Sequence, residues 1–121
     1  SVIKVESSFI ADSFSNKGAI GLMQLKPKTA FYIVDKIEDV DLSTAHELYD
    51  PVLNIKIGIN YLSYLINKFR NNKKYALIAY NIGPTRLKNM LNNKMKIPEK
   101  YYNAVKNNYL EILDFINQKL T

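Results

Sequence analysis

The sequence predicts an all-α fold of about six helices around one buried central helix. Apolar residues recur at steps of three and four along most of the chain, and no persistent alternation typical of strands occurs. Of the 121 residues, 47% are apolar, whereas glycine and proline number only four each. This composition is typical of a globular protein, and the length suits one domain with one core.

The N-terminal region predicts two helices separated by a turn. Four apolar residues are spaced to form the buried side of a short first helix: Val2, Ile3, Val5 and Phe9. Gly18 and Gly21 flank the turn, and Pro27 opens the second helix. Its helical spacing continues through Thr29, Ala30, Ile33, Val34 and Ile37. Residues 38–49 are polar and mixed, which predicts a connecting loop.

The clearest element follows, and it predicts the central helix. Asp50 is a good N-cap and Pro51 suits the first helical position. One apolar stripe contains Leu53, Ile57, Tyr61, Leu65 and Phe69, and a broader one adds Ile55, Ile59, Leu62 and Ile66. A helix that is apolar over most of its girth is buried. Gly58 lowers helix stability, so we expect it to allow the close approach of another helix.

The C-terminal half predicts a turn and three further helices. Residues 71–74 form the turn, and the next helix ends at Gly83 and Pro84. Pro84 begins another helix, with Leu87, Met90 and Leu91 facing inward. Pro98 then opens a long amphipathic helix to about residue 120. Its expected inward side is made of Val105, Tyr109, Ile112, Phe115 and Ile116.

Charge and composition exclude several classes of function. The net charge of +6 comes mostly from lysine, since only Arg70 and Arg86 are arginines. This fits general attraction to an anionic polymer, although a compositional bias of the source genome is the stronger explanation. The absence of cysteine excludes disulfides and thiolate chemistry. His46 alone makes neither a metal site nor a catalytic triad, and no apolar run could span a bilayer.

Three stretches could carry chemistry. Glu6 is either a solvated surface charge or a carboxylate in a half-apolar cleft, where desolvation raises its pKa and makes it a general acid. "GAIGLMQ" is either a turn before core residues or a loop that presents the amide of Gln24. Tyr80 and Asn81, in "AYNIGP", either belong to the core and a helix end or are exposed for sugar binding.

These stretches form an ordered set of motifs. Glu-Ser-Ser-Phe is followed by Gly-Ala-x-Gly-Leu-Met-Gln-Leu-x-Pro-x-Thr-Ala, then by Asp-Pro-x-x-Asn-Ile-x-x-Gly-x-x-Tyr-Leu, and last by Ala-Leu-x-Ala-Tyr-Asn-x-Gly-Pro. Over about residues 1–105 the chain resembles the catalytic domain of soluble lytic transglycosylases, relatives of goose-type lysozyme. The resemblance implies a lysozyme-like fold for residues 1–121, taken as one domain that could be a fragment of a longer secreted protein.

The resemblance also implies a reaction. Members of this family cleave the β-1,4 bond between N-acetylmuramic acid and N-acetylglucosamine without water and leave a 1,6-anhydro ring. They use one carboxylate, which here is Glu6. The N-acetyl carbonyl of the substrate stabilises charge at C1, so a second carboxylate is not needed. Glu6 acts first as an acid and then as a base toward the sugar's own 6-hydroxyl.

The remaining site residues follow from the resemblance. Ser15 helps to hold the reacting N-acetyl group, and Gln24 lines the cleft near Glu6. Leu22 and Met23 are candidates for the apolar lining of the cleft. The pair Tyr80 and Asn81 belongs to the opposite wall, while Asn54 occupies a position that looks structural.

Two positions depart from the family pattern. The family's C-terminal tyrosine, which approaches the catalytic glutamate, is assigned to Tyr101, with Tyr102 as a close rival. Lys26 replaces a frequent methionine and predicts a more polar subsite.

Two alternatives to this reading remain open. If Asp12 were a second carboxylate, the enzyme would be a hydrolysing, goose-type-like muramidase. A non-catalytic module could instead keep the groove and bind cell-wall glycan. Nucleic-acid binding ranks last, because no groove-reading helix or aromatic–basic RNA motif is present. We expect a monomer in the periplasm or cell envelope that acts on peptidoglycan strands with no metal or organic cofactor and no stable membrane insertion.

Overall fold

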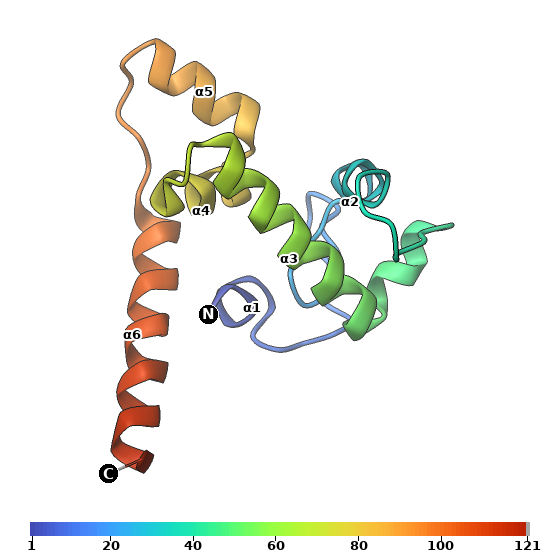
Figure 1. Cartoon of the computed structure of the whole chain (residues 1–121), viewed down its shortest axis with the longest axis horizontal. Helices are drawn as coiled ribbons and strands as arrows, with labels where there is room; N and C mark the ends of the chain where they lie inside the picture. The colour runs from blue at the N-terminus through green and yellow to red at the C-terminus, as the bar shows by residue number, and fades with distance from the viewer. Residues whose placement is uncertain (121) are drawn as a thin grey trace. The chain divides into compact units, whose positions relative to one another are not determined.

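The computed structural model describes residues 1–120. The regular secondary structure of these residues is helical, with no strand (Figure 1). Its elements are α1 (Val2–Ser7), α2 (Pro27–Val34), the 3-10 helix η1 (Ala45–Tyr49), α3 (Pro51–Lys68), α4 (Lys73–Ile82), α5 (Pro84–Asn92) and α6 (Lys100–Leu120). Extended pairing is limited to two isolated bridges, Phe14 with Ile20 and Ile20 with Leu25. The predicted all-α class is therefore confirmed.

The chain divides into two compact units, and the division falls within α3. The N-terminal unit comprises Val2–Ser63, and the C-terminal unit comprises Ser1 and the chain from Tyr64 on. That both units together form one domain stays a prediction.

The first helix of the N-terminal unit is shorter than its apolar pattern predicts. Helix α1 ends at Ser7, and both Ser8 and Phe9 then adopt left-handed backbone conformations, with φ of 53° and 65°. This reversal takes Phe9 off the helix face, and its side chain is 64% exposed. The prediction that Phe9 lies on the buried side of the helix is therefore wrong.

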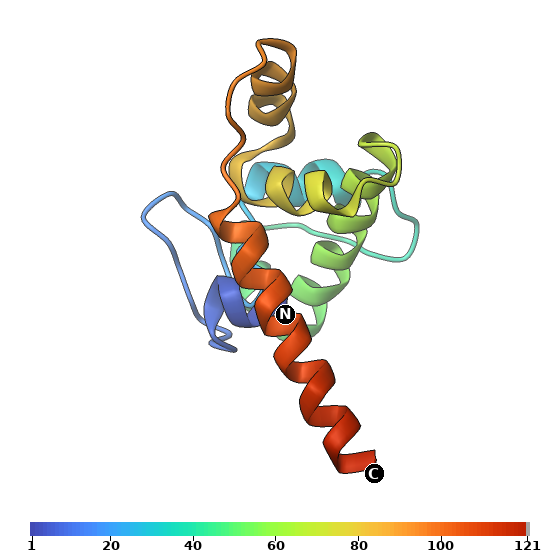
Figure 2. The same ribbon diagram turned by 90° about the vertical axis from the view of Figure 1, so that its left-hand side faces the viewer.

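A loop joins α1 to α2 and extends away from α1 (Figure 2). Its two arms are joined where Ser15 N–H donates to the carbonyl of Ala19 at 2.9 Å and Gly21 N–H donates to the carbonyl of Ser13 at 2.8 Å. Gly18 and Gly21 both have positive φ, as the expected turn requires. Helix α2 then begins at Pro27 and ends at Val34, so the helical pattern predicted to reach residue 37 is overextended.

The stretch 38–49, predicted to be a connecting loop, contains the helix η1. The Glu47 carboxylate accepts hydrogen bonds from the backbone N–H groups of Ser43 and Thr44, at 2.6 and 2.7 Å. Leu48 is fully buried and anchors the short helix. The signal for this element was the Thr-x-x-Glu spacing of a capping box, which the polar composition of the stretch obscured.

Helix α3 begins as its sequence predicts. The Asp50 carboxylate accepts hydrogen bonds from the N–H groups of Val52 and Leu53, at 2.9 and 3.1 Å, so it caps the helix. Its buried residues include Asn54, Ile57, Tyr61 and Leu65. Ile59, predicted to broaden the buried stripe, is 57% exposed. The buried face of α3 is therefore narrower than the face that its apolar residues cover.

Gly58 allows a close approach, but the group that approaches it is the side chain of Met23, which lies in the loop before α2. A Cβ at this position would lie 2.2 Å from the sulfur of Met23 and 2.8 Å from its terminal carbon. The expectation that another helix approaches Gly58 is therefore wrong. The glycine instead lets the loop before α2 lie directly against α3, which positions the chain that follows Gly21.

In the C-terminal unit, α4 packs against both α5 and α6. The Asn72 side chain caps α4 by accepting a hydrogen bond from Tyr75 N–H at 3.0 Å, so the helix begins inside the turn predicted at residues 71–74. Gly83, with φ of 94°, ends α4 and also precedes α5, which begins at Pro84 as predicted. Leu87 is the buried anchor of α5.

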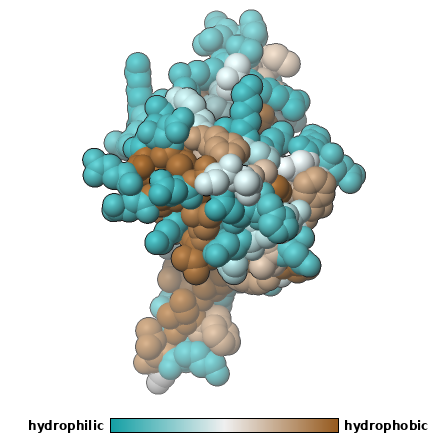
Figure 3. Space-filling model, turned by 90° about the vertical axis from the view of Figure 1, so that its right-hand side faces the viewer, coloured by the Kyte–Doolittle hydropathy of each residue, from teal (hydrophilic) through white to brown (hydrophobic). Residues whose placement is uncertain are grey.

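Helix α6 ends near residue 120 as predicted, but it begins at Lys100, two residues after Pro98, and its buried face differs from the prediction. Val105 is buried, whereas Tyr109, Ile112, Phe115 and Ile116 are exposed, against the prediction. Helix α4, with 10 residues, is about 15 Å long, and α6, with 21 residues, is about 32 Å long. Helix α4 therefore cannot cover the whole of α6, and Figure 3 shows apolar side chains gathered on the surface along its C-terminal half.

The capping carboxylate of η1 gives a test by pH. Hydrogen bonds from the backbone of Thr44 and Ser43 lower the pKa of Glu47 in the folded state. Its contribution to stability is therefore present above the pKa of an unfolded glutamate, about 4.3, and is lost as the pH falls through the lower folded pKa. We expect Glu47→Gln to lower the melting temperature at pH 7 and to match the wild type at the acid end of a pH series. The exposed Glu38→Gln serves as the control, and an equal loss at every pH would contradict the assignment.

Candidate active site

Glu6 lies in the last turn of α1 and is half-buried. The next residue, Ser7, is buried and donates its hydroxyl to the carbonyl of Ile3 at 3.1 Å, which fixes the end of the helix. A carboxylate at this position is partly removed from water and still reachable. The general-acid role of Glu6 stays a prediction.

The side chain of Gln24 holds the loop that follows Glu6. Its Nε2 atom donates to the carbonyls of Gly21, at 2.9 Å, and Ser13, at 3.2 Å. Gln24 itself has a left-handed backbone, with φ of 51°, a strained conformation that the surrounding hydrogen bonds maintain. Both amide hydrogens are thus directed to the protein, and the carbonyl oxygen of Gln24 is the atom that a ligand could use.

Ser15 lies in the turn at the end of this loop, and its hydroxyl has a defined orientation. Ala19 N–H donates to Ser15 Oγ at 3.0 Å, so the hydroxyl oxygen serves as an acceptor within the protein. A hydroxyl that accepts in this way can still donate its own hydrogen. Ser15 is half-buried and can therefore offer one donor to a carbonyl such as that of an N-acetyl group.

Asn54 joins three backbone segments around this loop. It is fully buried, and its Oδ1 accepts from Met23 N–H at 2.8 Å. Its Nδ2 donates to the carbonyls of Ile20 and Leu48, both at 2.9 Å. The structural role expected of Asn54 is therefore confirmed. Gly21 leaves room for this amide, since a Cβ there would lie 2.3 Å from Asn54 Nδ2.

The two apolar residues between Gly21 and Gln24 differ in exposure. Leu22 is half-buried, whereas Met23 is only 4% exposed and packs on Gly58. Met23 therefore belongs to the core of the N-terminal unit and offers a substrate little area. Asp12, the alternative second carboxylate, is exposed, and so is Lys26, which was expected to make a subsite more polar.

The other predicted site residues lie in the C-terminal unit. Tyr80 and Asn81 are in the last turn of α4, where Asn81 is exposed but Tyr80 is only 8% exposed. Of the two alternatives that the sequence left open, Tyr80 follows the core placement and Asn81 the exposed one. Tyr80 therefore exposes only a small part of its surface.

The structure separates the two candidate tyrosines at the start of α6. Both are half-buried, but the ring of Tyr102 lies 5.3 Å from the ammonium nitrogen of Lys74 on α4. Successive residues of a helix point about 100° apart, so Tyr101 projects in a different direction. Tyr102 thus contacts α4 through Lys74, and the assignment of Tyr101 as the site residue stays a prediction.

Sequence reasoning missed the contacts that place Tyr102. Lys74 forms an ion pair with Glu99, the residue directly before α6. The hydrogen bond between them raises the pKa of Lys74 and lowers the pKa of Glu99. Nothing in the sequence pairs residues 25 positions apart, so only the packing of α4 on α6 reveals this contact.

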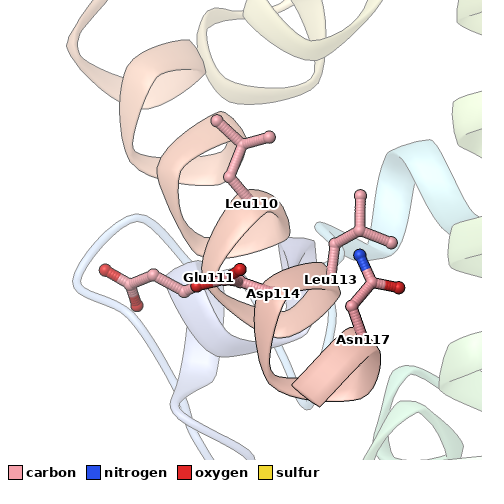
Figure 4. Close-up of a pocket in the computed structure, with 5 residues that line it drawn as sticks. All are labelled: Leu110, Glu111, Leu113, Asp114 and Asn117. Atoms are coloured by element: carbon pink, nitrogen blue, oxygen red, sulfur yellow. The ribbon is translucent and has the colours of Figure 1, made fainter. Parts of the chain in front are cut away.

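Glu6, Ser15, Leu22, Met23 and Gln24 thus lie in the N-terminal unit, and Tyr80, Asn81 and Tyr101 lie in the C-terminal unit. A shallow surface hollow on α6 contains none of these residues; it is lined by Leu110, Glu111, Leu113, Asp114 and Asn117 (Figure 4). Within residues 1–120, no cluster of three or more histidine or acidic side chains could hold a metal ion. None of the helices described is both long and apolar enough to cross a membrane.

The sequence was compared with protein families. Residues 1–103 match the model of the transglycosylase SLT domain. The chain belongs to this family. The match covers α1 to α5 and the first turn of α6, and it includes every predicted site residue.

Curated relatives agree with this assignment. The chain is 38% identical over 92 residues to the soluble lytic murein transglycosylase of Escherichia coli K12, a match that covers 76% of this chain and 14% of that protein. It is 34% identical over 126 residues to the membrane-bound lytic murein transglycosylase E of Buchnera aphidicola subsp. Baizongia pistaciae, covering 98% and 58%. The chain thus spans only a small part of the Escherichia coli relative.

A solved structure gives the same family and fold. The 70 kDa soluble lytic transglycosylase of Escherichia coli superimposes with a TM-score of 0.71 at 38% identity, over 76% of this chain and 15% of that one. At this identity the likeness supports common ancestry as well as a common fold. The predicted lysozyme-like SLT fold is therefore confirmed.

The hydrogen bonds of Asn54 give a test of how α3 holds the loop that precedes α2. We expect Asn54→Ala to destabilise the protein by about 3 kcal/mol or more, because it removes three buried hydrogen bonds and takes the Asn54 partner away from Met23 N–H and the Leu48 carbonyl. Urea unfolding measures the change. Asn60→Ala removes one solvent-exposed hydrogen bond, from Asn60 Nδ2 to the Lys56 carbonyl. It should lower the free energy of unfolding by less than about 1 kcal/mol. Similar losses in both variants would contradict the role of Asn54.

Proposed function

We propose that this chain is the catalytic domain of a peptidoglycan lytic transglycosylase. It cleaves the β-1,4 bond between N-acetylmuramic acid and N-acetylglucosamine and leaves 1,6-anhydro-muramic ends. The single observation that carries the proposal is the half-buried Glu6 at the start of a chain that matches the SLT domain over residues 1–103. The named relatives are lytic murein transglycosylases, which supports the same reaction class.

The reaction needs one carboxyl group. Protonated Glu6 donates to the glycosidic oxygen, and the bond from C1 to that oxygen breaks. The acetamido carbonyl of the muramic residue stabilises the positive charge at C1, and the Ser15 hydroxyl donates to that acetamido group. The 6-hydroxyl of the same sugar then bonds to C1 and gives its proton to ionised Glu6. Glu6 ends protonated, and no water is consumed.

The other predicted residues bind and align the glycan. Gln24 keeps the loop between Glu6 and Ser15 in place and has its carbonyl oxygen available, and Leu22 contributes apolar surface. In the C-terminal unit, Asn81, Tyr80 and Tyr101 also contact glycan. One solved relative, the lytic transglycosylase of Pseudomonas aeruginosa, was crystallised as an inactive glutamate-to-glutamine mutant, which supports an essential glutamate here.

The proposed setting follows from the substrate. Peptidoglycan lies outside the cytoplasmic membrane, so the enzyme works in the periplasm or cell envelope. The net charge of +6 favours retention on an anionic wall, and added salt weakens that attraction. We propose that the domain acts as a monomer without a cofactor.

The decisive experiment digests purified peptidoglycan in water enriched in ¹⁸O and identifies the sugar ends by mass spectrometry. We expect anhydro-muramic ends without ¹⁸O. Glu6→Gln should lower the rate by about 10²–10⁴-fold, because the proton donor is lost. Glu38→Gln, an exposed glutamate of the same unit, should leave the rate unchanged.

Other outcomes separate the alternatives. Reducing ends that carry ¹⁸O would show hydrolysis, and their loss in Asp12→Asn would identify Asp12 as the second carboxylate. Equal activity of Glu6→Gln and wild type would contradict the mechanism. Binding to the wall with no release of fragments by either protein would favour the non-catalytic module.

A further inference from the structure

Tyr101 lies in the first turn of α6, in the C-terminal unit. Residues 95–99 form no regular structure after α5. Glu99 is tied into α6 by its backbone, since its carbonyl accepts from Asn103 N–H at 2.9 Å. Helix α6 also packs against α4, so contacts between these two helices act on its first turn.

Lys74 of α4 makes such contacts on both sides of Tyr101 along the chain. Its ammonium group pairs with the carboxylate of Glu99, two residues before Tyr101. The same ammonium nitrogen lies 5.3 Å from the ring centroid of Tyr102, one residue after it, a distance at which a cation and an aromatic ring attract. One lysine thus holds the residues that flank Tyr101.

The exposure of the pair indicates what it does. The side chains of Lys74 and Glu99 are 42% and 49% exposed, and ion pairs this open to water contribute little to overall stability. The hydrogen bond raises the pKa of Lys74 and lowers that of Glu99, so both groups stay charged through the neutral range. Because the contacts of Lys74 with Glu99 and Tyr102 add little to stability, we assign them the role of orienting the start of α6 against α4.

We propose that Lys74, Glu99 and Tyr102 form a clamp that sets the position of Tyr101 relative to α4, the helix that carries Tyr80 and Asn81. The three are positioning residues, and their effect on turnover acts through Tyr101. This inference rests on the proposed function, in which Tyr101, Tyr80 and Asn81 contact the glycan. It assigns a role to Lys74 and Glu99, which lie outside the motifs of the family resemblance, and a different role to Tyr102 from that of the family's tyrosine.

The clamp is tested by kinetics on peptidoglycan with Glu99→Gln and Lys74→Met. We expect each variant to lower kcat about two- to fivefold, a size suited to a surface ion pair, with KM little changed. In a Tyr101→Phe background, Glu99→Gln should cause no further loss, because the group it positions is gone. Salt should narrow the gap between Glu99→Gln and wild type, since it screens the pair.

The chain offers a matched control. Lys119 lies 5.5 Å from the ring centroid of Phe115, which is the same kind of contact on the same helix but far along it from Tyr101. Lys119→Met should leave kcat unchanged. An unaltered kcat in Glu99→Gln, or a loss of equal size with and without the Tyr101 hydroxyl, would overturn the proposal.

An NMR measurement tests whether the clamp positions Tyr101 and does not depend on enzymatic activity. The ring signals of Tyr101 in an NMR spectrum, assigned with Tyr101→Phe, should shift in Glu99→Gln and stay in place in Lys119→Met. Signals unmoved in Glu99→Gln would overturn the clamp even if the wild type released no glycan. Absence of anhydro products from the wild type, with shifted signals, would instead contradict the proposed function alone.

Discussion

The buried amide of Asn54 is the interaction on which the candidate site depends. Three of its hydrogen bonds connect α3 to the backbone at Ile20, Met23 and Leu48. An amide in this position is satisfied only if all three segments keep their places, because each unpaired buried group would carry a desolvation penalty. The path of the loop between Glu6 and Gln24 is thus set from α3, a helix that carries none of the proposed catalytic groups.

Two glycines make this arrangement possible. Gly21 has a left-handed backbone and leaves space for the Asn54 amide, while Gly58 leaves space for the Met23 side chain. Together they allow the loop to lie directly against α3 at two successive points. The Gln24 amide then adds a second tie, to the carbonyls of Gly21 and Ser13. The proposed mechanism needs such preorganisation, because Ser15 and Glu6 must meet the same sugar.

The two units fix their functional groups by different means. In the N-terminal unit, buried hydrogen bonds hold a loop. In the C-terminal unit, helices carry the groups, and α4 is joined to the start of α6 by a half-exposed lysine. Buried amides give rigidity that salt does not change, whereas an exposed ion pair responds to ionic strength.

The sequence by itself determined the helical class, the starts of α2, α3 and α5, and the family. These depend on local signals such as Pro27, the Asp50 cap and the ordered motifs, which neighbouring residues create together. Its pattern could not show that α1 ends before Phe9, that Tyr80 is buried, or that the apolar stripe of α6 lies exposed beyond Asn108. Tertiary structure decided these points, because burial depends on which distant segment lies opposite a side chain. The contacts of Lys74 with Glu99 and of Gly58 with Met23 join residues far apart in the chain, and no periodicity encodes them.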